Sequence, residues 1–165
     1  MRLAKTAMAL AALMLTSAAA PAERIAGEIS SWGRVQNGWQ ISAGGEALLA
    51  VREGSDFNDY YLVTRRARVG AKGFRTIAGL VKPLRRMVGV KPRCKPAPTD
   101  GPYGAVTWTE AGKPVRFDFN SYCASRQTDK GFARNELARA QIGRWAANGE
   151  IVARKWMGAP EREPK

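Results

Sequence analysis

Hydrophobic and polar residues alternate with a period of two through much of the segment 24–69, which is typical of β-strands. The strands expected from this pattern cover residues 24–32, 46–52 and 60–69. Asn37-Gly38 is a preferred pair for a type I′ turn, so we expect a hairpin between Val35-Gln36 and Trp39–Ile41. Gly44-Gly45 marks a further turn. The pattern therefore predicts a meander of four antiparallel strands.

The hydrophobic period changes to that of a helix over residues 72–88. One face of this helix is apolar and carries Phe74, Ile77, Val81, Leu84 and Val88. The opposite face is cationic and carries Lys72, Arg75, Lys82 and Arg86. Because Pro83 lacks a backbone donor, the helix is expected either to kink there or to end near Val81.

A hairpin and a second helix are predicted in the last third of the chain. Residues 105–109 and 115–119 flank a turn at 110–113, and Thr128 or Asp129 would cap a helix that runs to about Asn148. Its expected buried stripe consists of Leu137, Ala138, Ile142 and Trp145. Ile151-Val152 adds a short strand, and among the five tryptophans Trp39 and Trp156 are expected to be the more exposed.

These elements predict an α+β domain, in which an antiparallel sheet, made of a meander plus a hairpin, carries two helices packed on one face. The expected domain spans residues 23–157, and the Pro- and charge-rich residues 158–165 form a flexible tail.

The first 22 residues have the layout of a secretory signal peptide. Arg2 and Lys5 precede the apolar segment 7–16, and small residues lead to a cleavage site after Ala22. The alternative, a membrane anchor, needs about 20 apolar residues, more than this segment offers. We therefore expect an exported protein, periplasmic or secreted, with no transmembrane span in its mature chain.

Export places Cys94 and Cys123 in a compartment where disulfides persist. The simplest expectation is one structural bridge between them, and the alternative is two free buried thiols. The chain has no C-x-x-C redox motif.

The composition excludes several classes of enzyme. The chain contains no histidine, so a Ser-His-Asp triad, a Cys-His dyad or a histidine-ligated metal site is impossible. Two cysteines cannot form a four-thiolate metal centre. We expect no cofactor, no metal and no catalytic residue. A hydrolase that uses two carboxylates, from among Asp100, Glu110 and Asp118, is the remaining enzymatic alternative.

The net charge of +13 has a local origin. No Asp or Glu occurs from Tyr60 to Thr99, and this window holds eleven of the 27 cations. The candidate basic surface consists of Arg65, Arg66, Arg68, Lys72, Arg75, Lys82, Arg85 and Arg86. Such a surface attracts polyanions, and the alternative is a solvated basic face without a ligand. Nucleic acid is a poor candidate because export separates the chain from it.

A second candidate is the proline-rich turn at residues 98–103, which follows Cys94. A disulfide-braced loop could present Asp100 and Tyr103 to a partner, as inhibitor loops do. The alternative is a structural turn capped by the Asp100 side chain.

The leading hypothesis is therefore a non-enzymatic exported module that binds an anionic envelope component or an acidic protein. A hydrolase inhibitor or protein-binding domain that uses the loop 98–103 is the second hypothesis. The sequence leaves the oligomeric state open.

Overall fold

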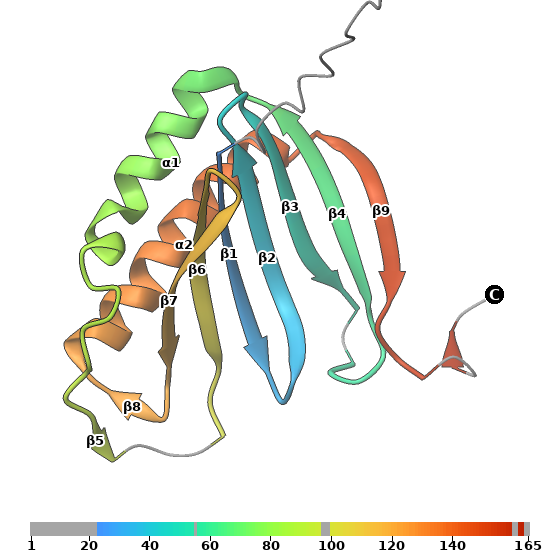
Figure 1. The fold of residues 1–165 in the computed structure, drawn as a ribbon. Helices are drawn as coiled ribbons and strands as arrows, with labels where there is room; N and C mark the ends of the chain where they lie inside the picture. Colours follow the sequence, from blue (N-terminus) through green and yellow to red (C-terminus); the bar gives the residue numbers. More distant parts are fainter. Residues whose placement is uncertain (1–22, 55, 97–99, 160–161, 164–165) are drawn as a thin grey trace, which may run out of the picture.

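The computed structural model describes residues 23–54, 56–96, 100–159 and 162–163 (Figure 1). The predicted signal peptide, residues 1–22, and the loop residues Pro98 and Thr99 lie outside the described residues. Neither helix in the described part of the chain is long and apolar enough to cross a membrane.

Seven antiparallel strands form one sheet in the order β7-β6-β1-β2-β3-β4-β9. The predicted meander is β1 (Arg24–Ser31), β2 (Arg34–Ser42), β3 (Glu46–Glu53) and β4 (Tyr61–Arg68). The predicted hairpin is β6 (Tyr103–Glu110) and β7 (Lys113–Asn120), which joins the meander through β1. The C-terminal strand β9 (Glu150–Trp156) pairs with β4. A small second sheet pairs β5 (Lys95–Pro96) with β8 (Cys123–Ala124).

Two helices cover one face of the large sheet, which confirms the predicted α+β class (Figure 1). They are α1 (Gly70–Arg85) and α2 (Arg126–Ala146). The hydrophobic core lies between the sheet and these helices, with Trp39, Ile41, Ile77, Val106 and Ile142 among its buried residues. No helix among the described residues covers the opposite face of the sheet, which we call the open face.

The predicted turn at Asn37-Gly38 is wrong, because both residues lie inside β2. The chain turns instead at Trp32-Gly33, where φ is 51° and 73°, the positive values that a type I′ turn needs. In this register Trp39 pairs with Gly27 and Ile41 pairs with Ile25, which buries the Trp39 and Ile41 side chains. The burial of these two side chains in register outweighs the local turn preference of Asn-Gly.

The helix α1 continues through Pro83 and ends two residues later, so it does not stop near Val81. A proline at position 83 removes one bond to the carbonyl of residue 79. Gly79 is exposed, so this carbonyl can be hydrated. The loss is confined to the last turn and does not end the helix early.

The start and the buried stripe of α2 differ from the prediction. Ser125 is the N-cap, and its Oγ accepts a hydrogen bond from the Thr128 backbone N–H at 3.2 Å. Leu137 is 49% exposed, and Trp145 is only partly buried. The residues that α2 buries are mostly small: Thr128, Gly131, Asn135, Ala138, Ile142 and Ala146. A face of small residues lets the helix lie close to the sheet, where Gly131 leaves room only for the Phe119 ring.

The prediction for the tryptophans is also wrong for Trp39, which is 3% exposed. Trp156 is partly buried, and the exposed tryptophan is Trp32, at 67%, in the β1–β2 turn. The predicted disulfide between Cys94 and Cys123 is confirmed. It ties the loop after α1 to β8, directly before α2 begins.

Candidate functional site

The eight cations of the predicted basic surface do not lie together. Arg65 and Arg66 on β4 have carboxylate neighbours. The Arg65 guanidinium lies 3.9 Å from Glu53, and that of Arg66 lies 3.7 Å from both Glu46 and Glu150. These two arginines neutralise acidic residues of the sheet and contribute little to a positive surface.

Arg85 also has a local partner, although it belongs to α1. Its guanidinium lies 3.3 Å from a carboxylate oxygen of Glu110 and 5.8 Å from the centre of the Trp108 ring. A guanidinium over an aromatic face gains a cation–π attraction. Arg85 therefore ties the C-terminal turn of α1 to the end of β6.

Three further cations of α1 and the cation at its C-cap form one continuous feature. Lys72, Arg75, Lys82 and Arg86 are all exposed, and none has an ion pair with an acidic side chain in the part of the chain that the structure describes. On an α-helix they fall within an arc of about 80° and span about 21 Å along the axis. We call these four residues the α1 stripe. The expectation that they share one face of the helix is confirmed.

The positive charge continues at both ends of the α1 stripe. Arg68 is exposed at the end of β4, two residues before α1 begins. Lys91 and Arg93 are exposed in the loop that leads from α1 to β5, and Lys95 is exposed in β5 itself. Figure 1 shows this loop beyond the end of α1. The segment from Tyr60 to Thr99 contains no acidic residue of its own, and in the described part of the chain acidic side chains from elsewhere pair only with Arg65, Arg66 and Arg85 among its cations.

The loop candidates are only partly described. Asp100 is exposed, and Tyr103 is a partly buried residue at the start of β6, paired with Asn120. The Ser121 N–H donates a hydrogen bond to the Pro102 carbonyl at 3.0 Å, which anchors the end of this loop.

The three candidate carboxylates do not converge on one site. Asp100 precedes the start of β6 and Glu110 is its last residue, so they lie at opposite ends of this strand, and Asp118 pairs with Ala105. Glu110 is bound to Arg85, and Asp118 is bound to Arg116. The described residues contain no group of three or more acidic or cysteine side chains placed to hold a metal ion.

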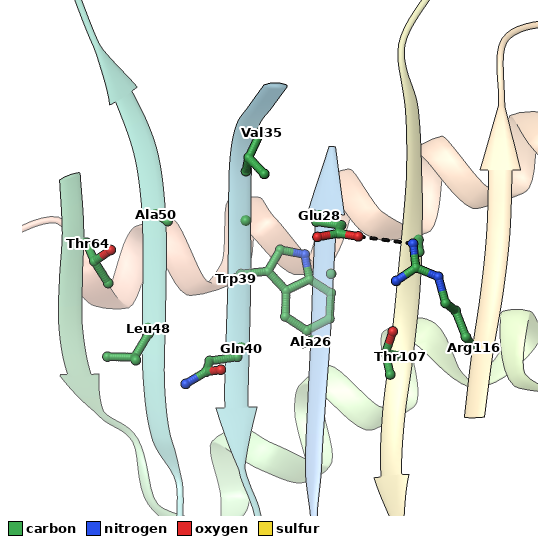
Figure 2. Close-up of a pocket in the computed structure, with 13 residues that line it drawn as sticks. Ala26, Glu28, Val35, Trp39, Gln40, Leu48, Ala50, Thr64, Thr107 and Arg116 are labelled. Carbon is green, nitrogen blue, oxygen red and sulfur yellow. Dashed lines mark hydrogen bonds and ion pairs between the residues drawn. The ribbon is translucent and has the colours of Figure 1, made fainter. Parts of the chain in front are cut away.

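Sequence reasoning missed a groove of about 360 Å³ on the open face of the sheet. Figure 2 shows it crossing the strands, between Thr64 on β4 and Arg116 on β7. Its floor is made of small residues, Ala26, Gly38, Ala50 and Ala105, and its walls include Val35, Gln40 and Leu48. The sequence signal was weak, because each strand has only one or two small residues between its core positions and the strand pairing brings them together.

One end of the groove holds a small ionic network (Figure 2). Arg116 lies 3.1 Å from a Glu28 oxygen and 2.7 Å from an Asp118 oxygen. Burial alone would lower the pKa of Arg116, but the hydrogen bonds and charges of Asp118 and Glu28 outweigh it and raise that pKa. The guanidinium is thus a permanent cation that holds two carboxylates.

No known protein family matches this chain, and no curated protein matches it either.

Proposed function

We propose that this chain is an exported, non-enzymatic binding protein whose α1 stripe holds a phosphate-bearing anionic surface of the cell envelope. The observation that carries the proposal is that Lys72, Arg75, Lys82 and Arg86 are exposed along one line and have no acidic partner among the described residues. A protein that used these residues only for solubility would intersperse both signs of charge.

Two features support export to the envelope. The sequence predicts a signal peptide with cleavage after Ala22, and the disulfide between Cys94 and Cys123 suits an oxidising compartment, periplasmic or extracellular. The anionic surface would then be one that faces that compartment, such as lipid phosphates.

The energetics favour a phosphate-bearing surface over an acidic protein. Each Lys or Arg near an anionic membrane surface contributes about 1 kcal/mol, so the α1 stripe supplies about 4 kcal/mol. A flat array of phosphates can meet four cations spread over about 21 Å of straight helix. An acidic protein would need carboxylates at matching spacing and is the less favoured partner. The loop 98–103 stays a hypothesis for a separate protein contact.

The test is cosedimentation of the mature protein with vesicles of equal parts phosphatidylcholine and phosphatidylglycerol. Pure phosphatidylcholine vesicles serve as the uncharged reference. We expect binding only to the anionic vesicles, with an affinity that falls steeply as salt is raised. The double variant Arg75→Glu/Arg86→Glu should lower the affinity at least about 30-fold, since two contributions of about 1 kcal/mol are lost and then reversed.

A matched control separates the α1 stripe from net charge. Lys113→Glu/Lys130→Glu changes the total charge by the same amount at exposed positions of β7 and α2, outside the α1 stripe. This variant should bind within a few-fold of the wild type. An affinity that does not change with salt, or that both double variants lower equally, would contradict the proposal.

A further inference from the structure

The open face of the sheet differs from a typical solvent-exposed sheet surface. Long polar side chains normally cover such a surface, whereas here small residues line a groove across six of the seven strands. None of Ala26, Gly38, Leu48, Ala50 and Thr64 is fully exposed, although both helices of the described residues lie on the other face of the sheet (Figure 1).

The strand register arranges this face in two parallel rows that cross the sheet. The first row, which we call the small row, is Asp118, Ala105, Glu28, Gly38, Ala50, Thr64 and Ala153. The second row, which we call the large row, is Arg116, Thr107, Ala26, Gln40, Leu48 and Arg66. Each member of the large row lies two residues along its strand from a member of the small row, on the same face.

From these rows we propose that the open face is the interface of a symmetric dimer with a second copy of this chain. A two-fold axis that runs across the strands, midway between the rows, places the large row of each copy over the small row of the other. Leu48 of one copy then lies over Ala50 of its partner, and Gln40 lies over Gly38. The groove of each copy is filled by side chains of the other.

The charges at the edge of the face are complementary under the same axis. Arg116 belongs to the large row and Asp118 to the small row, so Arg116 of each copy meets Asp118 of the other. Within one copy Arg116 is already paired with Asp118 and Glu28, and Arg66 with Glu46 and Glu150, so the contact between copies extends an existing ionic network. The rows carry no charge on the central strands β2 and β3, where they consist of Gly38, Gln40, Leu48 and Ala50, and their charged residues lie to either side of these strands.

The size of the face also suits a dimer. Strands about 4.8 Å apart and residues about 3.4 Å apart give seven strands of about eight residues an area of about 900 Å². A stable interface of standard size buries about 800 Å² per partner. The cations of the α1 stripe lie in the helical layer, on the other side of the sheet, so they do not repel one another across this interface.

Dimerisation has a consequence for the proposed function, although it does not depend on it. The two sheets meet in the middle, so the two helical layers and their α1 stripes face outward on opposite sides. Such a dimer presents two cationic surfaces, and it would bridge two anionic vesicles where a single copy would only coat one.

Sedimentation equilibrium of the mature protein, without any ligand, tests the dimer. We expect a mass of two chains at micromolar concentration for the wild type. Ala50→Arg should give the mass of one chain, because its side chain occupies the groove that Leu48 of the other copy must fill. Ala133→Arg, which adds the same side chain at an exposed position of α2, should leave the dimer intact.

A charge exchange at the edge gives a second test that a folding defect cannot imitate. Arg116→Glu and Asp118→Arg should each weaken the homodimer at least tenfold, because like charges then face each other. An equimolar mixture of these two variants should recover the wild-type affinity as a heterodimer, since both contacts become complementary again.

Three results would overturn the proposal. They are a single-chain mass for the wild type at all concentrations, a dimer that Ala50→Arg does not disrupt, and a mixture of the charge variants that forms no heterodimer. A one-chain mass accompanied by a small molecule in native mass spectrometry would assign the groove to a ligand instead. Because no vesicle is present, none of these results bears on the α1 stripe.

Discussion

The indole Nε1 of Trp39 donates a hydrogen bond to Oδ1 of Asn135 at 2.9 Å, in the buried layer between β2 and α2. Trp39 is 3% exposed and Asn135 is fully buried. Gly27, the partner of Trp39 on β1, lies directly beneath this bond, and a Cβ at that position would overlap both side chains. The three residues together determine how closely α2 approaches the sheet.

Gly27→Ala should therefore destabilise the protein by about 1–3 kcal/mol, because the added methyl group overfills a packed site. Gly79→Ala is the matched control. A Cβ at position 79 meets no atom within 4 Å, and alanine favours the helix over glycine by about 1 kcal/mol. Urea unfolding of the two variants should shift the midpoint in opposite directions. Equal shifts would show that the site at Gly27 is not tightly packed.

The two glycines of the first hairpin test the position of the turn. Gly33 has a φ of 73°, which an L-residue adopts at a cost of about 1–2 kcal/mol, whereas Gly38 lies within β2 without a positive φ. Gly33→Ala should lower the free energy of unfolding by about that amount, and Gly38→Ala should change it much less. If urea unfolding showed a larger loss of unfolding free energy for Gly38→Ala than for Gly33→Ala, the turn would instead lie at Asn37-Gly38.

The disulfide closes a loop with a sequence separation of 29 between Cys94 and Cys123. Loop-closure entropy in the unfolded chain predicts that the bridge contributes about 3–4 kcal/mol. The variant Cys94→Ala/Cys123→Ala, and the wild type in reducing buffer, should both lose this amount in urea unfolding. If reductant lowered the unfolding free energy of the double variant as well, the loss seen for the wild type in reducing buffer would not come from the disulfide.

The ion pair between Glu136 and Arg139 on α2 predicts a small dependence of stability on pH. Hydrogen bonds from Arg139 lower the pKa of Glu136 below its ordinary value of 4.5, against the opposing effect of burial. The pair therefore stabilises the fold above pH 4.5, and this contribution is lost as the pH falls through the lowered pKa. Because the Glu136 side chain is 57% exposed, the effect is only a few tenths of a kcal/mol.

Glu136→Gln removes the titrating group and tests this contribution. Its difference in urea midpoint from the wild type should be small at pH 7 and should vanish in acid. If the difference in urea midpoint grew as the pH was lowered, the pH dependence of the contribution from this ion pair would be opposite to the expected one.

The sequence by itself determined the features that depend on local periodicity. The period-two segments of β1, β3 and β4 and the helical period of α1 were sufficient for the α+β class. The two cysteines were sufficient for the bridge, and the spacing of Lys72, Arg75, Lys82 and Arg86 was sufficient to place them on one face. These properties follow from the geometry of a single strand or helix, or from there being only one possible partner.

The tertiary structure decided everything that depends on the partner of an element. Asn37-Gly38 has the local chemistry of a turn, but the pairing of Trp39 with Gly27 and the helix above it keep β2 straight. Leu137 is apolar, but the buried side of α2 carries Asn135 and Ala138, which leaves Leu137 on the outer side of the helix. Arg65, Arg66 and Arg85 belong to the basic segment, but acidic residues distant in sequence neutralise them.

The groove on the open face also depends on the pairing of distant strands, because each of its small residues is an ordinary residue within its own strand. Only the register of β6, β1, β2, β3 and β4 brings Ala105, Gly38, Ala50 and Thr64 into one row. Local sequence specifies which face of a strand a residue occupies. Long-range pairing specifies its neighbours, and those neighbours decide whether a charge is free and whether a surface is hollow.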